Sequence, residues 1–161
     1  MSALGLPQST AGPPRPAEGR SGSIPAILWG RNEDTRLLLR GLLRLNRYPI
    51  LREVASLDEL RALPAASDPR LLVMDAEAEQ GDWNEEVAAA LREQPQLRVV
   101  VILPRDSSDS EERARAAGAR ATVVRPFAIR DLVAALDRAT RDDAPPPPPP
   151  PRAEPPSLRQ R

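Results

Sequence analysis

The sequence contains no cysteine, no histidine and no lysine. The absence of cysteine and histidine excludes disulfide frameworks, thiol nucleophiles, Cys/His zinc sites and histidine acid–base chemistry. All 23 basic residues are arginine, so an arginine where lysine is usual carries little information by itself. Any catalysis would depend on carboxylates, and we predict that the chain is not an enzyme.

The charges are balanced, with 23 basic and 23 acidic residues and a formal net charge of zero. A chain without a strong positive field is not expected to bind nucleic acid or an anionic membrane. No segment approaches the roughly 18 apolar residues of a membrane span. Prolines and glycines interrupt the N-terminus where a signal peptide needs an unbroken apolar stretch. We therefore expect a cytoplasmic protein.

The length of 161 residues allows one ordinary domain with a hydrophobic core. Residues 1–23 and 141–161 are rich in proline and small residues, and positions 145–151 are all proline. We predict disordered tails on both sides of one domain at residues 24–140. The proline run is expected to act as a spacer or, alternatively, as a polyproline ligand for an aromatic-lined groove.

Within the predicted domain, short apolar runs alternate with segments of helical periodicity. Ser56 and Glu59 have capping-box spacing, and Gly118 stands where a helix would end. The expected strands are 24–29, 49–54, 71–74, 97–103 and 122–124, and the expected helices are 35–45, 56–63, 83–93, 109–117 and 129–139. Apolar strands joined by helices predict an α/β fold, a doubly wound five-stranded parallel sheet in a three-layer, flavodoxin-like arrangement.

In such sheets, ligands and chemistry collect beyond the carboxyl ends of the strands. The residues that we expect at this edge are Gly30, Arg31, Asp75, Pro104 and Arg125.

Three segments carry a resemblance to a known family: AILWGRNEDTRLLLRGLL, LRVVVIL and GARATVVRPF. They resemble the receiver domain of two-component response regulators, over the whole predicted domain. The resemblance implies that Asp75 is the phosphoacceptor aspartate. The family has an acidic pair at Gly30 and Arg31, a hydroxyl residue at Pro104 and a lysine at Arg125, so the chain is similar to a degenerate receiver.

The resemblance also implies a Mg²⁺ site formed by the acidic pair and Asp75, since Mg²⁺ prefers oxygen ligands. A guanidinium at Arg31, about 5 Å from the ion, would repel it by roughly 6 to 7 kcal/mol at an effective dielectric constant of 20. A millimolar site supplies only about 4 kcal/mol. Glu33, Asp34 and Glu77 are the nearby carboxylates that remain. We expect weak or lost Mg²⁺ binding and no other cofactor.

Three interpretations of Asp75 remain open: an active phosphoacceptor, a carboxylate paired with Arg31 or Arg125, and a solvated side chain. In one version, Arg31 replaces the metal as a built-in cation, and Asp75→Ala loses stability without any kinase. Trp83 either packs over the first turn of its helix or is an exposed anchor for a partner.

Our first hypothesis is a stand-alone degenerate receiver module that acts by protein–protein interaction, with impaired or absent phosphorylation. A histidine kinase or a downstream signalling protein would be its partner. One alternative is a working single-domain response regulator that a histidine kinase phosphorylates on Asp75. The other is a nucleotide-binding protein or enzyme on the same scaffold, although only one glycine follows the first strand, at Gly30.

Overall fold

A computed structural model describes residues 24–76, 82–105 and 108–141. The predicted tails lie outside these residues, except for Arg141. In chain order the elements are β1 (Ala26–Trp29), α1 (Glu33–Leu45), β2 (Ile50–Val54), α2 (Leu57–Arg61), β3 (Arg70–Asp75), α3 (Trp83–Glu93), β4 (Leu97–Leu103), α4 (Ser108–Ala117), β5 (Ala121–Val124) and α5 (Ile129–Thr140). The predicted alternation of strands and helices is confirmed.

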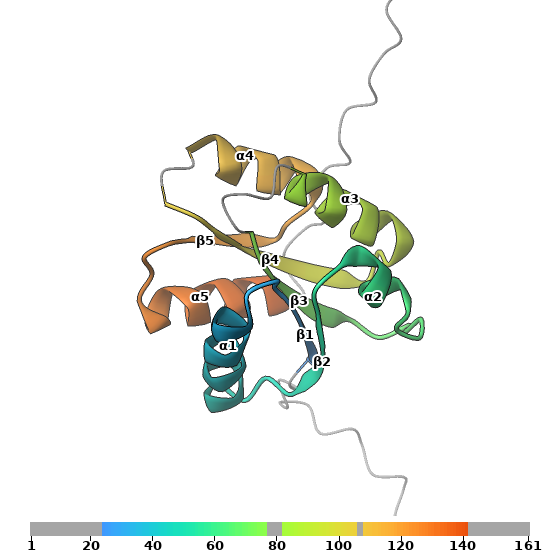
Figure 1. Cartoon of the computed structure of the whole chain (residues 1–161), viewed down its shortest axis with the longest axis horizontal. Coiled ribbons are helices and arrows are strands. Elements are labelled where there is room, and N and C mark those ends of the chain that lie inside the picture. Colours follow the sequence, from blue (N-terminus) through green and yellow to red (C-terminus); the bar gives the residue numbers. More distant parts are fainter. Residues whose placement is uncertain (1–23, 77–81, 106–107, 142–161) are drawn as a thin grey trace, which may run out of the picture.

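The strands form one parallel sheet in the order β2-β1-β3-β4-β5. Helices cover both faces, with α1 and α5 on one side and α2, α3 and α4 on the other (Figure 1). This arrangement is the predicted three-layer, doubly wound fold. From the carboxyl ends of the neighbouring strands β1 and β3, the chain continues into α1 on one face of the sheet and into α3 on the other, and such a switch point opens a crevice at the carboxyl edge.

Both faces of the sheet are apolar because the helices exclude water from each of them. Every residue of β4 is buried, including the arginine at position 98. Arg98 donates a hydrogen bond of 2.5 Å from Nη1 to the carbonyl of Thr140. The buried guanidinium therefore binds the C-terminal end of α5, where a cation interacts favourably with the helix dipole.

The helix ends follow from local chemistry. Asn32 caps α1, because its Oδ1 accepts from the backbone N–H of Thr35 at 3.1 Å, so the helix begins two residues before the predicted position. The Ser56 hydroxyl accepts from the N–H of Glu59 at 3.2 Å, as predicted for α2. Gly118 ends α4 with φ of 105°, which confirms the predicted cap.

Candidate functional site

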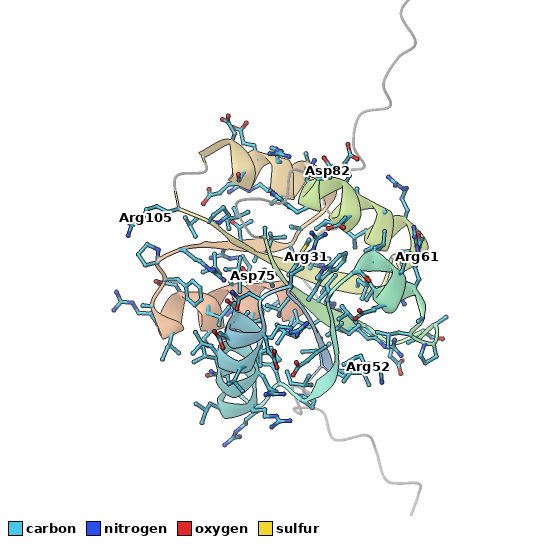
Figure 2. The ribbon with its side chains drawn as sticks, viewed as in Figure 1. Arg31, Arg52, Arg61, Asp75, Asp82 and Arg105 are labelled. Atoms are coloured by element: carbon cyan, nitrogen blue, oxygen red, sulfur yellow. The ribbon has the colours of Figure 1, made fainter. Side chains whose placement is uncertain are left out.

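The candidate site lies at the carboxyl edge of the sheet, where β3 ends at Asp75 (Figure 2). Asp75 is opposite Ile102 of β4, and only 1% of its surface is exposed. Burial of a carboxylate is costly unless a cation or hydrogen-bond donor compensates the charge. The groups that contact Asp75 therefore determine what this carboxylate can do.

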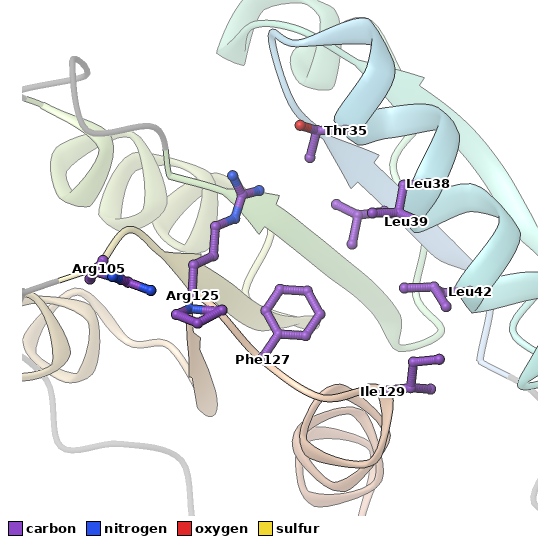
Figure 3. A pocket seen from close by; sticks show the side chains of 9 residues that line it. Thr35, Leu38, Leu39, Leu42, Arg105, Arg125, Phe127 and Ile129 are labelled. Carbon is purple, nitrogen blue, oxygen red and sulfur yellow. The ribbon is translucent and has the colours of Figure 1, made fainter.

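Arg125 contacts Asp75 directly. Its Nη2 donates a hydrogen bond of 2.5 Å to Oδ1 of Asp75. Arg125 follows β5, two strands from β3, and Figure 3 shows its side chain extending toward the end of β3. A charge-assisted hydrogen bond of this length is among the stronger polar contacts in proteins. Of the two pairings left open by the sequence, the structure shows the one with Arg125.

Arg31 has a different contact. Its Nη2 lies 3.7 Å from Oε1 of Glu86 on α3, and about half of its side chain is exposed. Burial raises the pKa of the Glu86 carboxyl above its usual value, the nearby Arg31 lowers it in part, and Asp82 raises it. The hypothesis that Arg31 is the built-in cation for Asp75 is therefore replaced by one in which Arg125 has this position.

Gly30 lies against Asp75 at the switch point of the sheet. A Cβ added to Gly30 would lie 3.6 Å from Cβ of Asp75 and 3.2 Å from Cγ of Arg36. Arg36 also donates a hydrogen bond of 3.0 Å from Nη1 to the carbonyl of Gly30. A third arginine thus packs over the position where receivers have an acidic residue. Arg36 is not among the residues predicted at this edge from the sequence, although its position in the first turns of α1 brings it there.

The ends of the next two strands complete the edge. Pro104 follows β4 and lacks a hydroxyl group that could donate to an anion. Thr122 of β5 is opposite Val101 of β4 and only partly buried. Glu77, which follows β3 in the sequence, lies outside the described residues.

The described residues at this edge do not include a cluster of metal ligands. Among residues 24–76, 82–105 and 108–141, no three histidine, cysteine, aspartate or glutamate side chains are grouped so that they could hold an ion. Glycine and arginine stand at the positions of the acidic pair, and the Arg125 guanidinium contacts the carboxylate that would be the third ligand. The donor set therefore does not fit Mg²⁺.

The start of α1 also lacks the features of a phosphate-binding loop. The Asn32 side chain already accepts from a backbone N–H of the first turn, and that turn contains Glu33 and Asp34. Acidic residues at a helix N-terminus interact favourably with the helix dipole but repel a phosphate group. This local chemistry argues against the nucleotide-binding alternative.

Trp83 is not exposed. It is 4% accessible and belongs to the core beneath α2, α3 and α4. The guanidinium carbon of Arg113 on α4 lies 5.4 Å from its ring centroid, within the range of a cation–π contact. The packing interpretation is confirmed, and the interpretation of Trp83 as an exposed anchor is wrong, because α4 covers the ring.

A groove opens next to the Asp75–Arg125 pair, between α1 and the connection from β5 to α5 (Figure 3). Its volume is about 590 Å³. Both walls are mainly apolar, and two arginines lie at one end. The lining residues are Thr35, Leu38, Leu39, Leu42, Arg105, Arg125, Pro126, Phe127 and Ile129.

Comparison with known proteins supports the receiver interpretation. No model of a known protein family matches the sequence. The transcriptional regulatory protein PdtaR of Mycobacterium tuberculosis, in strains CDC 1551 and H37Rv, is 33% identical over 104 residues. The aligned part is 65% of this chain and 50% of PdtaR, so the chain spans about half the length of these curated relatives.

Solved structures with the same fold include receiver domains. A response regulator receiver domain protein from Clostridium thermocellum aligns with a TM-score of 0.63 and 16% identity, covering 73% of this chain and 94% of that one. A CheY-like receiver domain protein from Methanospirillum hungatei has a TM-score of 0.59 at 19% identity, covering 73% and 94%. A putative pilus assembly-related protein from Burkholderia pseudomallei has a TM-score of 0.60 at 24% identity, covering 74% and 90%.

These likenesses show the fold. Residues 24–141, as far as the structure describes them, have the receiver fold of response regulators, which confirms the resemblance to receiver domains. None of the helices described is long and apolar enough for a membrane span.

Proposed function

We propose that this chain is a degenerate receiver module in which an internal ion pair replaces metal-dependent phosphorylation and which signals by protein–protein contact. The observation that carries the proposal is the 2.5 Å hydrogen bond between Arg125 and the buried Asp75. The pair leaves the acceptor carboxylate neutralised by a group of the protein itself.

The chemistry of phosphoryl transfer supports this proposal. A carboxylate that accepts a phosphoryl group needs cations that neutralise the charge developing on the phosphoryl oxygens, and receivers obtain them from a metal ion. Here Gly30 and Arg31 replace the acidic ligands, while Arg125 holds one oxygen of Asp75. Pro104 cannot donate a hydrogen bond to a transferred phosphoryl group. Both the transfer and its usual structural readout lack the groups they need.

A role in protein contact is supported by the exposed apolar residues. Leu38 at 60% and Ile129 at 58% are exposed on opposite walls of the groove beside the ion pair. Concave apolar surfaces with a few charged groups are typical of binding sites. A signalling protein, such as a histidine kinase or a downstream target, is the partner that we propose.

A working phosphoacceptor is the second candidate. Asp75 stands at the end of β3, where the receiver resemblance places the phosphoacceptor, and a basic residue follows β5 as in receivers. A guanidinium binds phosphate oxygens well. If the Arg125–Asp75 bond opens, Arg125 has the chemistry to hold the transferred group in place of lysine.

Intact-mass analysis after incubation with acetyl phosphate separates the two candidates. We expect no phosphoryl adduct on the wild-type chain, with or without Mg²⁺. The variant Gly30→Asp/Arg31→Asp rebuilds the acidic pair, and the new Cβ at position 30 would lie 3.2 Å from Cγ of Arg36 and 3.6 Å from Cβ of Asp75, so Arg36 has to shift slightly to accommodate it. This variant should gain an Mg²⁺-dependent adduct that disappears when Asp75→Ala is added. An Mg²⁺-dependent adduct on the wild type, absent in Asp75→Ala, would establish the second candidate instead.

A further inference from the structure

Helix α1 has an apolar face that points away from the domain. Leu39 and Leu43 of this 13-residue helix are buried against the sheet. On the opposite side, Leu37 is 57% exposed and Leu45 is 82% exposed, and Leu38, 60% exposed, lies between this side and the groove. These three leucines and Gly41, which lies between them, form what we call the α1 stripe. Large leucines exposed together on one helix commonly mark an interaction surface.

Gly41 has no evident role inside the domain. A Cβ added at this position would meet no atom within 4 Å, so no packing within the domain requires glycine there. Glycine in the exposed interior of a helix destabilises the helix relative to alanine. The residue becomes useful when a second backbone approaches α1 closely, because the missing side chain lets two helices approach at that point.

The charges along α1 are complementary to those of a second α1 helix that runs antiparallel to it. Glu33 and Asp34 lie in the first turn, Arg44 lies in the last turn, and all three are exposed. In an antiparallel pair of α1 helices centred on Gly41, Arg44 of one copy would lie about 6 Å along the axis from Asp34 of the other copy, within reach of the arginine side chain. The dipoles of the two helices would also point in opposite directions, which is the favourable arrangement for neighbouring helices. A surface complementary to itself is what a two-fold interface requires.

We propose that two copies of this chain associate through an antiparallel pairing of their α1 stripes, with the helices crossing at Gly41. Leu37 and Leu45 are equally spaced from Gly41, so each packs against the other residue in the second copy. The contact is small, because α1 is only about 20 Å long and a stable interface buries about 800 Å² per partner. The dimer is therefore weak and forms with increasing concentration.

Sedimentation equilibrium of the full chain over a range of concentrations measures the association. We expect a monomer–dimer equilibrium that Leu45→Glu weakens at least ~10-fold, because it places two carboxylates in the apolar contact. Ile129→Glu is the control, since Ile129 is also exposed, at 58% against 82% for Leu45, and lies on α5, across the groove from α1. A wild-type chain that stays monomeric at all concentrations overturns the proposal, as does a dimer lost in Ile129→Glu and kept in Leu45→Glu.

Cross-linking tests the direction of the helices, and the absence of cysteine from the chain makes single-cysteine variants clean. Gly41→Cys should form a disulfide-linked dimer under mild oxidation, since the crossing places the two residues side by side. Leu37→Cys should not, because an antiparallel pair separates the two copies of residue 37 by about 12 Å along the helix axes, beyond disulfide reach. Equal cross-linking of both variants would reject the antiparallel geometry.

Neither measurement depends on phosphorylation or on a partner. The dimer and the proposed function therefore fail or succeed separately. Acetyl phosphate treatment reports on Asp75, and sedimentation reports on α1.

Discussion

Two arginine–carboxylate pairs in this molecule are almost equally short and lie in different surroundings. Arg125 contacts Asp75 at 2.5 Å, and Arg61 contacts Glu93 at 2.7 Å. The Asp75 side chain is fully buried beneath a guanidinium that is 36% exposed, whereas both members of the second pair are more than 40% exposed. The distance alone therefore says little about what each pair does.

The difference lies in what remains when one partner is removed. Water solvates Glu93 at once if Arg61 is lost, so an exposed pair contributes little to stability. Asp75 has no such access, and loss of Arg125 would remove a charge-assisted hydrogen bond from a buried carboxylate. A third pair, Arg31 and Glu86 at 3.7 Å, is intermediate, because a quarter of the Glu86 side chain is exposed. The three pairs form a series that mutation can test.

Arg125→Met should have the largest effect. It keeps the length of the side chain and removes the charge that compensates Asp75. We expect the free energy of unfolding to fall by about 3 kcal/mol, at the lower end of the range for broken buried pairs because the guanidinium is partly exposed. Urea denaturation followed by the fluorescence of the buried Trp29 and Trp83 measures this. Arg61→Met is the matched control, and equal losses in both variants would contradict the role of burial.

Adding Asp75→Asn to Arg125→Met should have the next largest effect, with the opposite sign. The neutral amide removes the buried charge that has lost Arg125, and we expect about 2 kcal/mol of stability to return. The comparison is a double-mutant cycle with Asp75→Asn alone as its fourth member. If the two losses simply add, the hydrogen bond of Arg125 to Asp75 contributes no coupling, and the proposed internal replacement of the metal loses its basis.

Much of the fold could be predicted because its signals are local. The apolar run of β4, interrupted only by Arg98, predicts a strand covered on both faces, and the position of Gly118 predicts the end of α4. The predicted bounds of α3 agree with the structure, Trp83–Glu93. Only short-range details escaped, such as the start of α1, where Asn32 adds a cap that extends the helix.

The sequence predicts which residues lie at the candidate site better than it predicts which of their side chains contact one another. Strand order gathers Gly30, Asp75 and Arg125 at one edge whatever their side chains do. Which arginine meets Asp75 depends on side-chain reach across β4, and sequence spacing does not encode this. Arg36 and Glu86 escaped for the same reason, since each reaches the site from a helix whose rotation relative to the sheet only packing decides.

Glu86→Gln tests the intermediate pair through its pH dependence. The pKa of Glu86 is raised in the folded protein, mainly by burial. The folded state thus binds this proton more tightly than the unfolded state, and the resulting stability is complete below pH about 4.5 and is lost as the pH rises through the raised pKa. Glutamine does not titrate, so the variant does not lose stability in this way as the pH rises. Relative to wild type, the variant should gain stability between acid and neutral pH, by less than about 1 kcal/mol. A gain in the stability of the variant relative to wild type as the pH falls would show that Arg31 affects the pKa of Glu86 more than burial does.

Arg61→Ala should have the smallest effect, although Arg61 makes the richest set of contacts. Its Nε lies 3.0 Å from both carboxylate oxygens of Glu93, and its Nη1 lies 3.1 Å from Asp58. Hydrogen bonds from Arg61 lower the pKa of Glu93, so the pair stabilises the fold above the usual glutamate pKa and this contribution is lost as the pH falls. Because the groups are exposed, salt at about 1 M, where the Debye length is about 3 Å, should remove most of the difference from wild type. Urea midpoints of Arg61→Ala and wild type measured at low and high salt test this, and a difference that persists at high salt would mean that geometry can outweigh exposure.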